Sequence, residues 1–287
     1  MADFDKLWNF NDPAGTEQAF RQRLVEFKSA GDTSQELELL TQIARTQGLQ
    51  QKFDDAHATL DDVERRMRPD EHLVRVQYLL ERGRAFNSSK QRERAMPLFM
   101  DAMNAAIEHG LDFYAVDAIH MLAIAEPDPA KQLAWNFKAM QLAEASKDDR
   151  ARGWLGSLYN NIGWIHYGQQ RYAEALEIFK KTVTFYEDAK RPKPLRIAHY
   201  SVGKTLRALG DLDRALSIQR ALHDDAEVKN EPDGYVCEEI AECLLAQGKV
   251  NEARPYFAEA YELLSPDEWL KRDEPERLTR LRANAMS

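Results

Sequence analysis

Residues 159–179 read YNNIGWIHYGQQRYAEALEIF, and this stretch contains the pattern that decides the fold. Gly163 is followed twelve positions later by Ala175, and Phe179 lies one helical turn further on. Small residues at two such positions let two helical backbones come close together, and a short joint between the helices makes them antiparallel. The stretch therefore predicts a helical hairpin.

The same pair of small residues recurs along the chain. It is found at Ala44 and Ala56, Gly83 and Ala95, Gly163 and Ala175, Gly203 and Ala215, and Ala241 and Ala253. These pairs follow one another at steps of 39, 80, 40 and 38 residues, and 80 is two steps of 40 with one weak copy between them. Repetition at such a period predicts an array of helical hairpins.

The weak copy, residues 111–147, allows two registers. Pairing Ala118 with Ala130 keeps the gap of twelve but breaks the 40-residue step. Placing Ala123 at the first position keeps the step, but its partner is then Trp135, which is not small. The sequence leaves both registers open.

One copy resembles the tetratricopeptide repeat (TPR) signature W-x2-L-G-x2-Y followed by A-x3-F. The matching residues are Tyr159, Ile162, Gly163 and His166, followed by Ala175 and Phe179. The resemblance covers about residues 33–266, and it implies an all-α fold: a right-handed α-solenoid of about six TPR-like helical hairpins. The period of 38 to 40 residues exceeds the usual 34, so this is expected to be a long-period variant. It resembles the longer arrays of bacterial peptide-sensing regulators and kinesin light chains.

Three segments are expected along the chain: an N-terminal arm and capping helix over 1–32, the TPR-like array over 33–265, and a C-terminal capping helix over 266–287. Asp12 and Pro13 predict a helix start, and Gly31 predicts its end. Thr33 and Glu36 have the spacing of a capping box, which predicts that the next helix starts there.

The net charge of -9 and the pI near 5.4 argue against a nucleic acid or an anionic membrane as the partner. The N-terminus lacks the apolar stretch of a signal peptide, which favours a cytoplasmic location. Cys237 and Cys243 are expected on one helix, about 240° apart around it and more than a turn apart in height, so they cannot bond to each other without breaking the helix. Without neighbouring histidines they predict no zinc site, and we expect no metal and no cofactor. Oligomeric state stays open.

No enzyme motif stands out. Gly203-Lys204-Thr205 ends like a phosphate-binding loop, but Ala198 stands where that motif needs glycine. The motifs G-x-S-x-G, H-E-x-x-H, C-x-x-C and G-x-G-x-x-G are absent. We therefore expect a protein that is not an enzyme.

The resemblance implies that the first helix of each hairpin lines a concave groove. Asn160, Trp164 and Tyr167 share one face of such a helix, at i, i+4 and i+7. Equivalent positions in the other copies, with flanking residues, complete the candidate groove: Arg45, Arg84, Asn87, Asp117, His120, Asn160, Asn161, Trp164, Tyr167, Tyr200, Lys204, Arg207, Tyr235, Glu238 and Glu242.

Two interpretations of this row compete. Aromatic side chains beside Lys204 and Arg207 suit the recognition of a peptide carboxylate. Alternatively, Trp164 packs against a neighbouring helix, and the two cations pair with Glu238 and Glu242 as a structural network. His166 and His199 stand at positions where the TPR motif has large core residues, so both are expected in the core.

The leading functional hypothesis is a non-catalytic scaffold or adaptor that binds a protein or peptide segment in the groove. The alternative is a cytoplasmic sensor that binds a short peptide or small molecule and signals by a change of solenoid curvature. A self-assembling scaffold is a third possibility. A clamp for chaperone C-termini is not expected, because no three consecutive copies carry its lysine, asparagine and arginine pattern.

Overall fold

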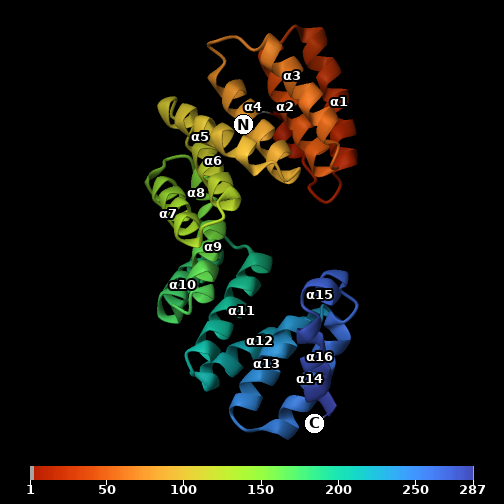
Figure 1. Ribbon diagram of the computed structural model, residues 1–287, viewed down its shortest axis with the longest axis vertical. Helices are drawn as coiled ribbons and strands as arrows, with labels where there is room; N and C mark the ends of the chain where they lie inside the picture. Colours follow the sequence, from red (N-terminus) through yellow and green to blue (C-terminus); the bar gives the residue numbers. More distant parts are fainter. Residues whose placement is uncertain (1–2, 287) are drawn as a thin grey trace. The chain divides into compact units, whose positions relative to one another are not determined.

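The computed structural model describes residues 3–286, and this part of the chain is helical throughout, without an assigned β-strand. The chain divides after Leu158 into two compact units. Within each unit, successive helices pack as neighbours in consecutive pairs (Figure 1). None of the helices within residues 3–286 is both long enough and apolar enough to cross a lipid bilayer.

The helix bounds follow the expected alternation. The first unit contains η1 (Asp3–Leu7), α1 (Pro13–Ala30), α2 (Thr33–Leu49), α3 (Phe53–Arg66), α4 (His72–Ser88), α5 (Arg92–Glu108), α6 (Asp112–Ala125), α7 (Pro129–Ala145) and α8 (Asp149–Arg152). Helix α9 (Leu155–Gly168) carries the division, and the second unit continues with α10 (Tyr172–Asp188), α11 (Pro192–Ala208), α12 (Leu212–Lys229), α13 (Gly234–Ala246), α14 (Val250–Leu264), α15 (Glu268–Asp273) and α16 (Pro275–Met286).

The ends of α1 are as predicted, but the start of α2 is not. The Asp12 side chain caps α1 by accepting a hydrogen bond from Gly15 N at 2.9 Å, and Gly31 ends the helix with φ of 71°. The expected capping box at Thr33 and Glu36 is wrong, because Asp32, one residue earlier, caps α2. The Glu36 carboxylate instead pairs with Arg66 at 2.8 Å.

The small first residue of the hairpin pattern makes room for a ring on the second helix. A Cβ added at Gly83 would lie 2.5 Å from the Phe99 ring, and one added at Gly163 would lie 2.4 Å from the Phe179 ring. Both phenylalanines are fully buried, sixteen residues after their glycine. They therefore fill the space inside their own hairpin.

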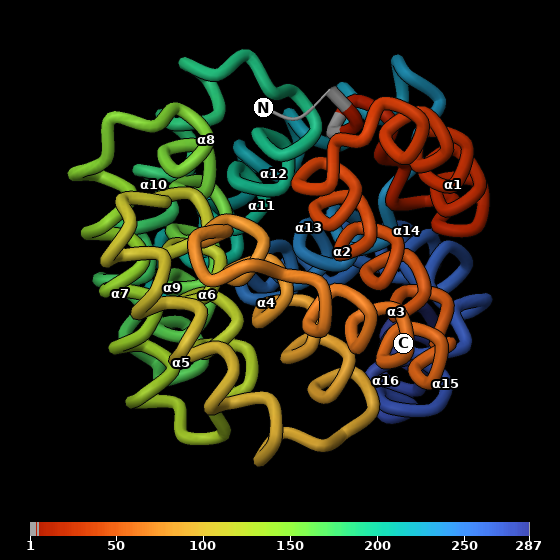
Figure 2. Tube along the Cα trace, turned by 90° about the horizontal axis from the view of Figure 1, so that it is seen from above, coloured from red at the N-terminus to blue at the C-terminus, as the bar shows by residue number. Residues whose placement is uncertain are grey.

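The burial of individual alanines bears on the two registers of the third hairpin. Ala139 is fully buried and lies sixteen residues after Ala123, which is 5% exposed. Ala130 is exposed, so it does not pack as the partner of Ala118. This burial argues against pairing Ala118 with Ala130, and the register that keeps the 40-residue step stays a prediction. Figure 2 shows α5, α6 and α7 side by side, in agreement with their contacts.

In the second unit, α16 packs against α14 at the C-terminal end of the described chain. Its apolar residues Leu278 and Leu281 are buried, as is Leu270 of the short helix α15. The capping segment expected over 266–287 thus forms two helices within residues 268–286, and Ser287 lies outside the described residues. The boundaries of the array at 32/33 and 265/266 remain predictions.

Candidate functional site

In the first unit, three of the candidate residues join a chain of alternating charges. Arg45 of α2 pairs with Glu81 of α4 at 3.3 Å, and Glu81 also pairs with Arg84 at 2.5 Å. Arg84 continues the chain to Asp117 of α6 at 2.5 Å. Burial lowers the pKa of the Arg84 guanidinium, but the carboxylates of Asp117 and Glu81 outweigh it and raise that pKa above its ordinary value. This chain links the first helices of three successive hairpins.

The other two candidate residues of this unit lie beside this series of ion pairs. The His120 ring packs 5.0 Å from the Trp154 ring, measured between ring centres. Burial lowers the pKa of His120, while the nearby Asp117 carboxylate opposes this shift and Arg84 adds to it. Asn87 is half-buried in the last turn of α4. His120 is therefore held in its neutral form more strongly than an exposed histidine.

In the second unit, Lys204 and Arg207 of α11 share one carboxylate, that of Glu239 on α13. Lys204 Nζ lies 2.5 Å from Glu239 Oε1, and Arg207 Nε donates to Glu239 Oε2 at 2.7 Å. Glu239 is only 1% exposed; burial raises its pKa, but the two cations lower it overall. The two cations do pair, as the structural interpretation holds, but their expected partners were wrong. The first turns of α13 direct Glu239, and not Glu238 or Glu242, toward α11.

Glu238 and Glu242 face the C-terminal helix α16 instead. Arg277 Nε donates to Glu238 Oε2 at 2.9 Å, and Arg280 Nη2 donates to Glu238 Oε1 at 2.8 Å. Arg280 also pairs with Glu242. The acidic end of the predicted row is thus neutralised by two arginines that the row did not contain.

Three tyrosines of the predicted row lie beside these ion pairs. The Tyr200 hydroxyl accepts a hydrogen bond from Lys204 Nζ at 3.4 Å, and Arg277 lies over the Tyr235 ring at 5.1 Å. Burial, reinforced by the negative charge of Glu239, raises the pKa of both Tyr167 and Tyr200 above the ordinary value. These hydroxyls therefore stay protonated and able to donate.

The remaining candidates lie on α9. The Trp164 ring packs edge-on against the Phe179 ring at 5.2 Å and against the Tyr167 ring at 5.3 Å. Asn160 and Asn161 are half-buried one turn earlier on the same helix. Trp164 thus packs within its own hairpin, as the structural interpretation holds, and it retains partial exposure.

The ionic residues of α11, α13 and α16 line an open depression of about 400 Å³ in the second unit. Its lining residues, called here the ionic face, are Lys204, Arg207, Glu238, Glu239, Glu242, Glu274, Arg277 and Arg280. Four positive and four negative side chains balance one another. The ionic face is therefore richly charged and close to neutral.

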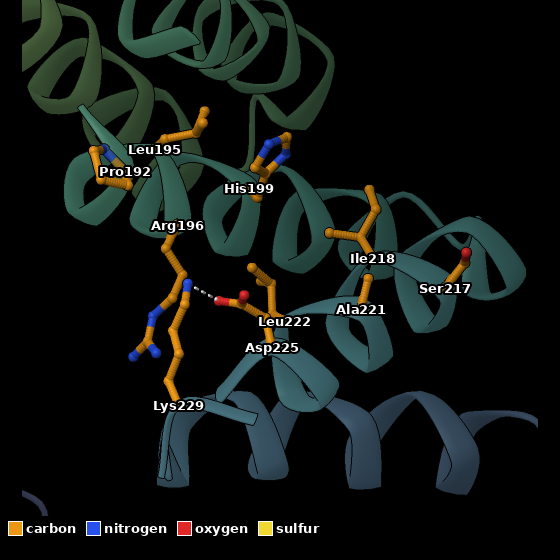
Figure 3. A pocket seen from close by; sticks show the side chains of 10 residues that line it. All are labelled: Pro192, Leu195, Arg196, His199, Ser217, Ile218, Ala221, Leu222, Asp225 and Lys229. Atoms are coloured by element: carbon orange, nitrogen blue, oxygen red, sulfur yellow. Dashed lines mark hydrogen bonds and ion pairs between the residues drawn. The ribbon is translucent and has the colours of Figure 1, made fainter. Parts of the chain in front are cut away.

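A second depression of about 440 Å³ lies between α11 and α12 (Figure 3). It is lined by Pro192, Leu195, Arg196, His199, Ser217, Ile218, Ala221, Leu222, Asp225 and Lys229. Lys229 and Asp225 pair at its rim at 2.6 Å. His199 is half-buried in this depression, so the expectation that it packs in the core was wrong, whereas His166 is buried as expected.

Sequence reasoning missed Glu81, Glu239, Arg277 and Arg280. Contacts between neighbouring first helices join residues separated by less than one repeat: 36 for Arg45 and Glu81, and 35 for Lys204 and Glu239. The predicted row of groove residues was built by adding the full repeat step of about 40 residues. This identifies equivalent positions in successive repeats and not the residues that are in contact. Opposite charges 32 to 36 residues apart were the available signal for Glu81 and Glu239, whereas Arg277 and Arg280 lie 38 to 42 residues from their partners.

The paired helices, with a small residue facing a side chain sixteen positions later, define an all-α helical repeat protein. Residues 155–189 match the family described as tetratricopeptide repeat, so this segment is similar to a TPR unit. A search of the curated proteins found no match.

Solved structures match nearly the whole chain at low sequence identity. The apo form of RapI has 11% identity and a TM-score of 0.72, covering 98% of this chain and 85% of its own. The TPR-sensor protein PH0952 from Pyrococcus horikoshii has 10% identity and a TM-score of 0.69, covering 96% of this chain and 45% of its own. The apo quorum sensor NprR from B. thuringiensis has 14% identity and a TM-score of 0.60, covering 94% and 83%. At these identities the similarity establishes the fold alone.

Proposed function

We propose that this protein is a non-catalytic, cytoplasmic scaffold or adaptor that binds a peptide or protein segment on its ionic face. The observation that carries the proposal is the concentration of eight charged side chains around one open depression, formed by the first helices α11 and α13 together with the C-terminal segment that includes α16. In the TPR-like arrangement this is the side on which a groove is expected, and half-buried tyrosines border it. Rigid aromatic rings and charged side chains together are typical of binding hot spots.

The charge balance indicates the kind of segment. Because each cation already has a carboxylate partner, a ligand has to exchange ion pairs instead of filling vacant ones. A segment that carries both acidic and basic side chains can supply a new partner to each of the two residues of an ion pair. A purely acidic segment leaves the displaced glutamates unpaired, so its binding costs more free energy. We therefore propose a partner segment of mixed charge, with no role for nucleic acid or membrane.

We expect the partner segment to bind first at the ion pair that is most exposed to solvent. Arg280 has 46% of its side chain exposed, whereas Lys204 and Arg207 have 19% and 25%. Breaking the Arg280 pairs with Glu238 and Glu242 thus requires the least rearrangement. A partner carboxylate that binds Arg280 would free Glu242, which a partner lysine or arginine could then occupy.

The test uses a randomised peptide library selected against the full chain, followed by affinity measurement with variants. Arg280→Glu reverses a charge on the ionic face; its matched control is Arg220→Glu on α12, whose side chain is 47% exposed and lies 4.0 Å from Glu252. Selected peptides should bind Arg280→Glu at least about tenfold more weakly, a loss of about 1.4 kcal/mol. Equal affinity for both variants, or no peptide enriched above background, would refute the proposal.

A regulatory role is the second candidate, favoured by the fold shared with RapI and with the quorum sensor NprR. In this version a short peptide or small molecule competes for Lys204 and Arg207, releases Glu239 and loosens the contact between α11 and α13. The step of 38 to 40 residues, which we interpret as a long-period TPR array, agrees with that class. A sensor should be stabilised against heat by a small ligand alone.

A further inference from the structure

Three side chains able to bind a metal ion converge in the second unit, away from the ionic face. They are His223 of α12, Cys237 of α13 and Glu259 of α14. One ligand atom from each lies within 4.8 Å of the other two. They are separated by 14 and 22 residues in the sequence, so only the packing of three helices brings them together.

The cluster is partly buried, and one of its ligand atoms lacks a hydrogen-bond partner within the described chain. Cys237 is fully buried, while the side chains of His223 and Glu259 are 19% and 35% exposed. Within the described chain, the buried His223 Nε2 has no hydrogen-bond partner, although a Glu259 carboxylate oxygen lies 3.5 Å away. A buried polar atom without a partner is uncommon in proteins and asks for an explanation such as an ion.

The surroundings of His223 suit a metal ligand. Its second ring nitrogen, Nδ1, lies 3.9 Å from the exposed Asp224 carboxylate, which is beyond hydrogen-bond distance. The Tyr256 ring packs edge-on at 5.6 Å and forms a wall of the cluster. The other ring nitrogen, Nε2, is the one that lies near Glu259.

We propose that His223, Cys237 and Glu259 bind a zinc ion, with a fourth position left to water. The donor set of one sulfur, one imidazole nitrogen and one carboxylate oxygen suits Zn²⁺, whereas Mg²⁺ and Ca²⁺ prefer oxygen alone. Bonds of about 2.0 to 2.3 Å in a tetrahedron place ligand atoms about 3.5 Å apart, so the three groups need to move inward by only about 1 Å. On binding, the Cys237 thiol gives up its proton to solvent and the sulfur bonds to the metal as thiolate.

Such an ion would join the hairpin of α13 and α14 to α12 of the preceding hairpin. It uses none of the eight residues of the ionic face, so the zinc site and the proposed peptide binding can fail independently. The site also changes the meaning of the two cysteines: Cys237 becomes a ligand, while Cys243, buried on the same helix, lies outside the cluster.

The experiment titrates the chelator-stripped full-length protein with Co²⁺, which shows thiolate-to-metal charge-transfer absorption, and then displaces it with Zn²⁺. Wild type and the matched control Cys243→Ala should each bind one equivalent with this absorption. Cys237→Ala should lose the absorption and bind Zn²⁺ at least about 100-fold more weakly. Loss of a residue that only hydrogen-bonds to a metal ligand already lowers metal affinity by up to about 100-fold, and loss of a ligand should lower it at least as much. Absence of the band in wild type, or equal Zn²⁺ affinity of the two cysteine variants, would overturn the proposal.

A second variant guards against misfolding of the buried cysteine mutant. His223→Gln changes a partly exposed side chain and keeps the thiol, and circular dichroism verifies that it is folded. It should also bind Zn²⁺ at least about tenfold more weakly. A folded His223→Gln variant with wild-type affinity would exclude His223 as a ligand and overturn the site.

Discussion

Replacing Glu239 with glutamine tests whether the ionic face holds two hairpins together. The Glu239 carboxylate accepts hydrogen bonds of 2.7 and 3.1 Å from Arg207 and lies 2.5 Å from Lys204 Nζ. Glutamine keeps the shape but removes the negative charge, and it turns an NH₂ group toward two cations. Removing one partner of a buried ion pair costs about 3–5 kcal/mol. Because Lys204 and Arg207 are 19% and 25% exposed and reach water in part, we expect the lower end, about 3 kcal/mol.

The matched control is Glu242→Gln on the same helix. Its partner Arg280 is 46% exposed, so the loss should stay below about 1 kcal/mol. Urea unfolding followed by circular dichroism gives the free energies of unfolding, and hydrogen exchange in peptides from α11 and α13 locates the loss, with α2 to α4 as an internal reference. A Glu239→Gln variant as stable as Glu242→Gln would refute the reasoning.

The same variant has a defined pH dependence. The cations hold the pKa of Glu239 below its usual 4.5 in the folded protein, despite the opposing effect of burial. The folded state therefore favours the ionised carboxylate, and this stabilisation is complete above pH 4.5 and is lost as the pH falls through the lowered folded pKa. The difference in stability between wild type and Glu239→Gln should thus be constant near neutrality and narrow in acid. A difference independent of pH down to the acid transition would contradict the assignment of Glu239 as a buried anion.

Two further predictions concern packing and protonation. Gly163→Ala places a methyl group 2.4 Å from the Phe179 ring and should destabilise the folded protein by about 1–3 kcal/mol. The control Gly168→Ala has no atom within 4 Å of the added methyl group and should change stability by less than about 1 kcal/mol. Equal melting temperatures of the two variants would count against the contact between Gly163 and the Phe179 ring. His120 should titrate below its usual pKa of 6.5 when its ring resonances are followed by NMR, because burial disfavours its charged form. The stability of the folded protein should therefore fall as the pH drops below 6.5. A ring that titrates at or above 6.5 would contradict this effect of burial on His120.

The fold was accessible from the sequence because helical hairpins impose a local and repeated constraint. Gly83, Gly163 and Gly203 each face the residue sixteen positions later, and this contact depends on residues within one hairpin. The details that failed were decided by competition among neighbours. Asp32 caps α2 in place of Thr33, and the Glu36 side chain pairs with Arg66 instead of the cap.

The candidate site was predicted less completely, because its contacts lie between hairpins. Tyr200, Lys204 and Arg207 were placed on the correct helix, but their partner Glu239 was missed by one residue, or about 100° around α13. Arg277 and Arg280 fall in the segment expected only to cap the array. The His223, Cys237 and Glu259 cluster had no sequence signal, since its spacings match no metal motif.

The contact between a glycine and a ring sixteen residues later also bears on how such repeats can diverge. At Gly83 and Phe99 the glycine faces an aromatic ring, while at Gly203 the residue sixteen positions later is Gln219, whose amide nitrogen would lie 2.6 Å from an added Cβ. The volume is thus divided differently in different copies of one chain. Because adding a methyl group on one side requires removing atoms or shifting the ring on the other, these two positions should co-vary among homologous hairpins, and selection acts on the pair and not on the glycine alone.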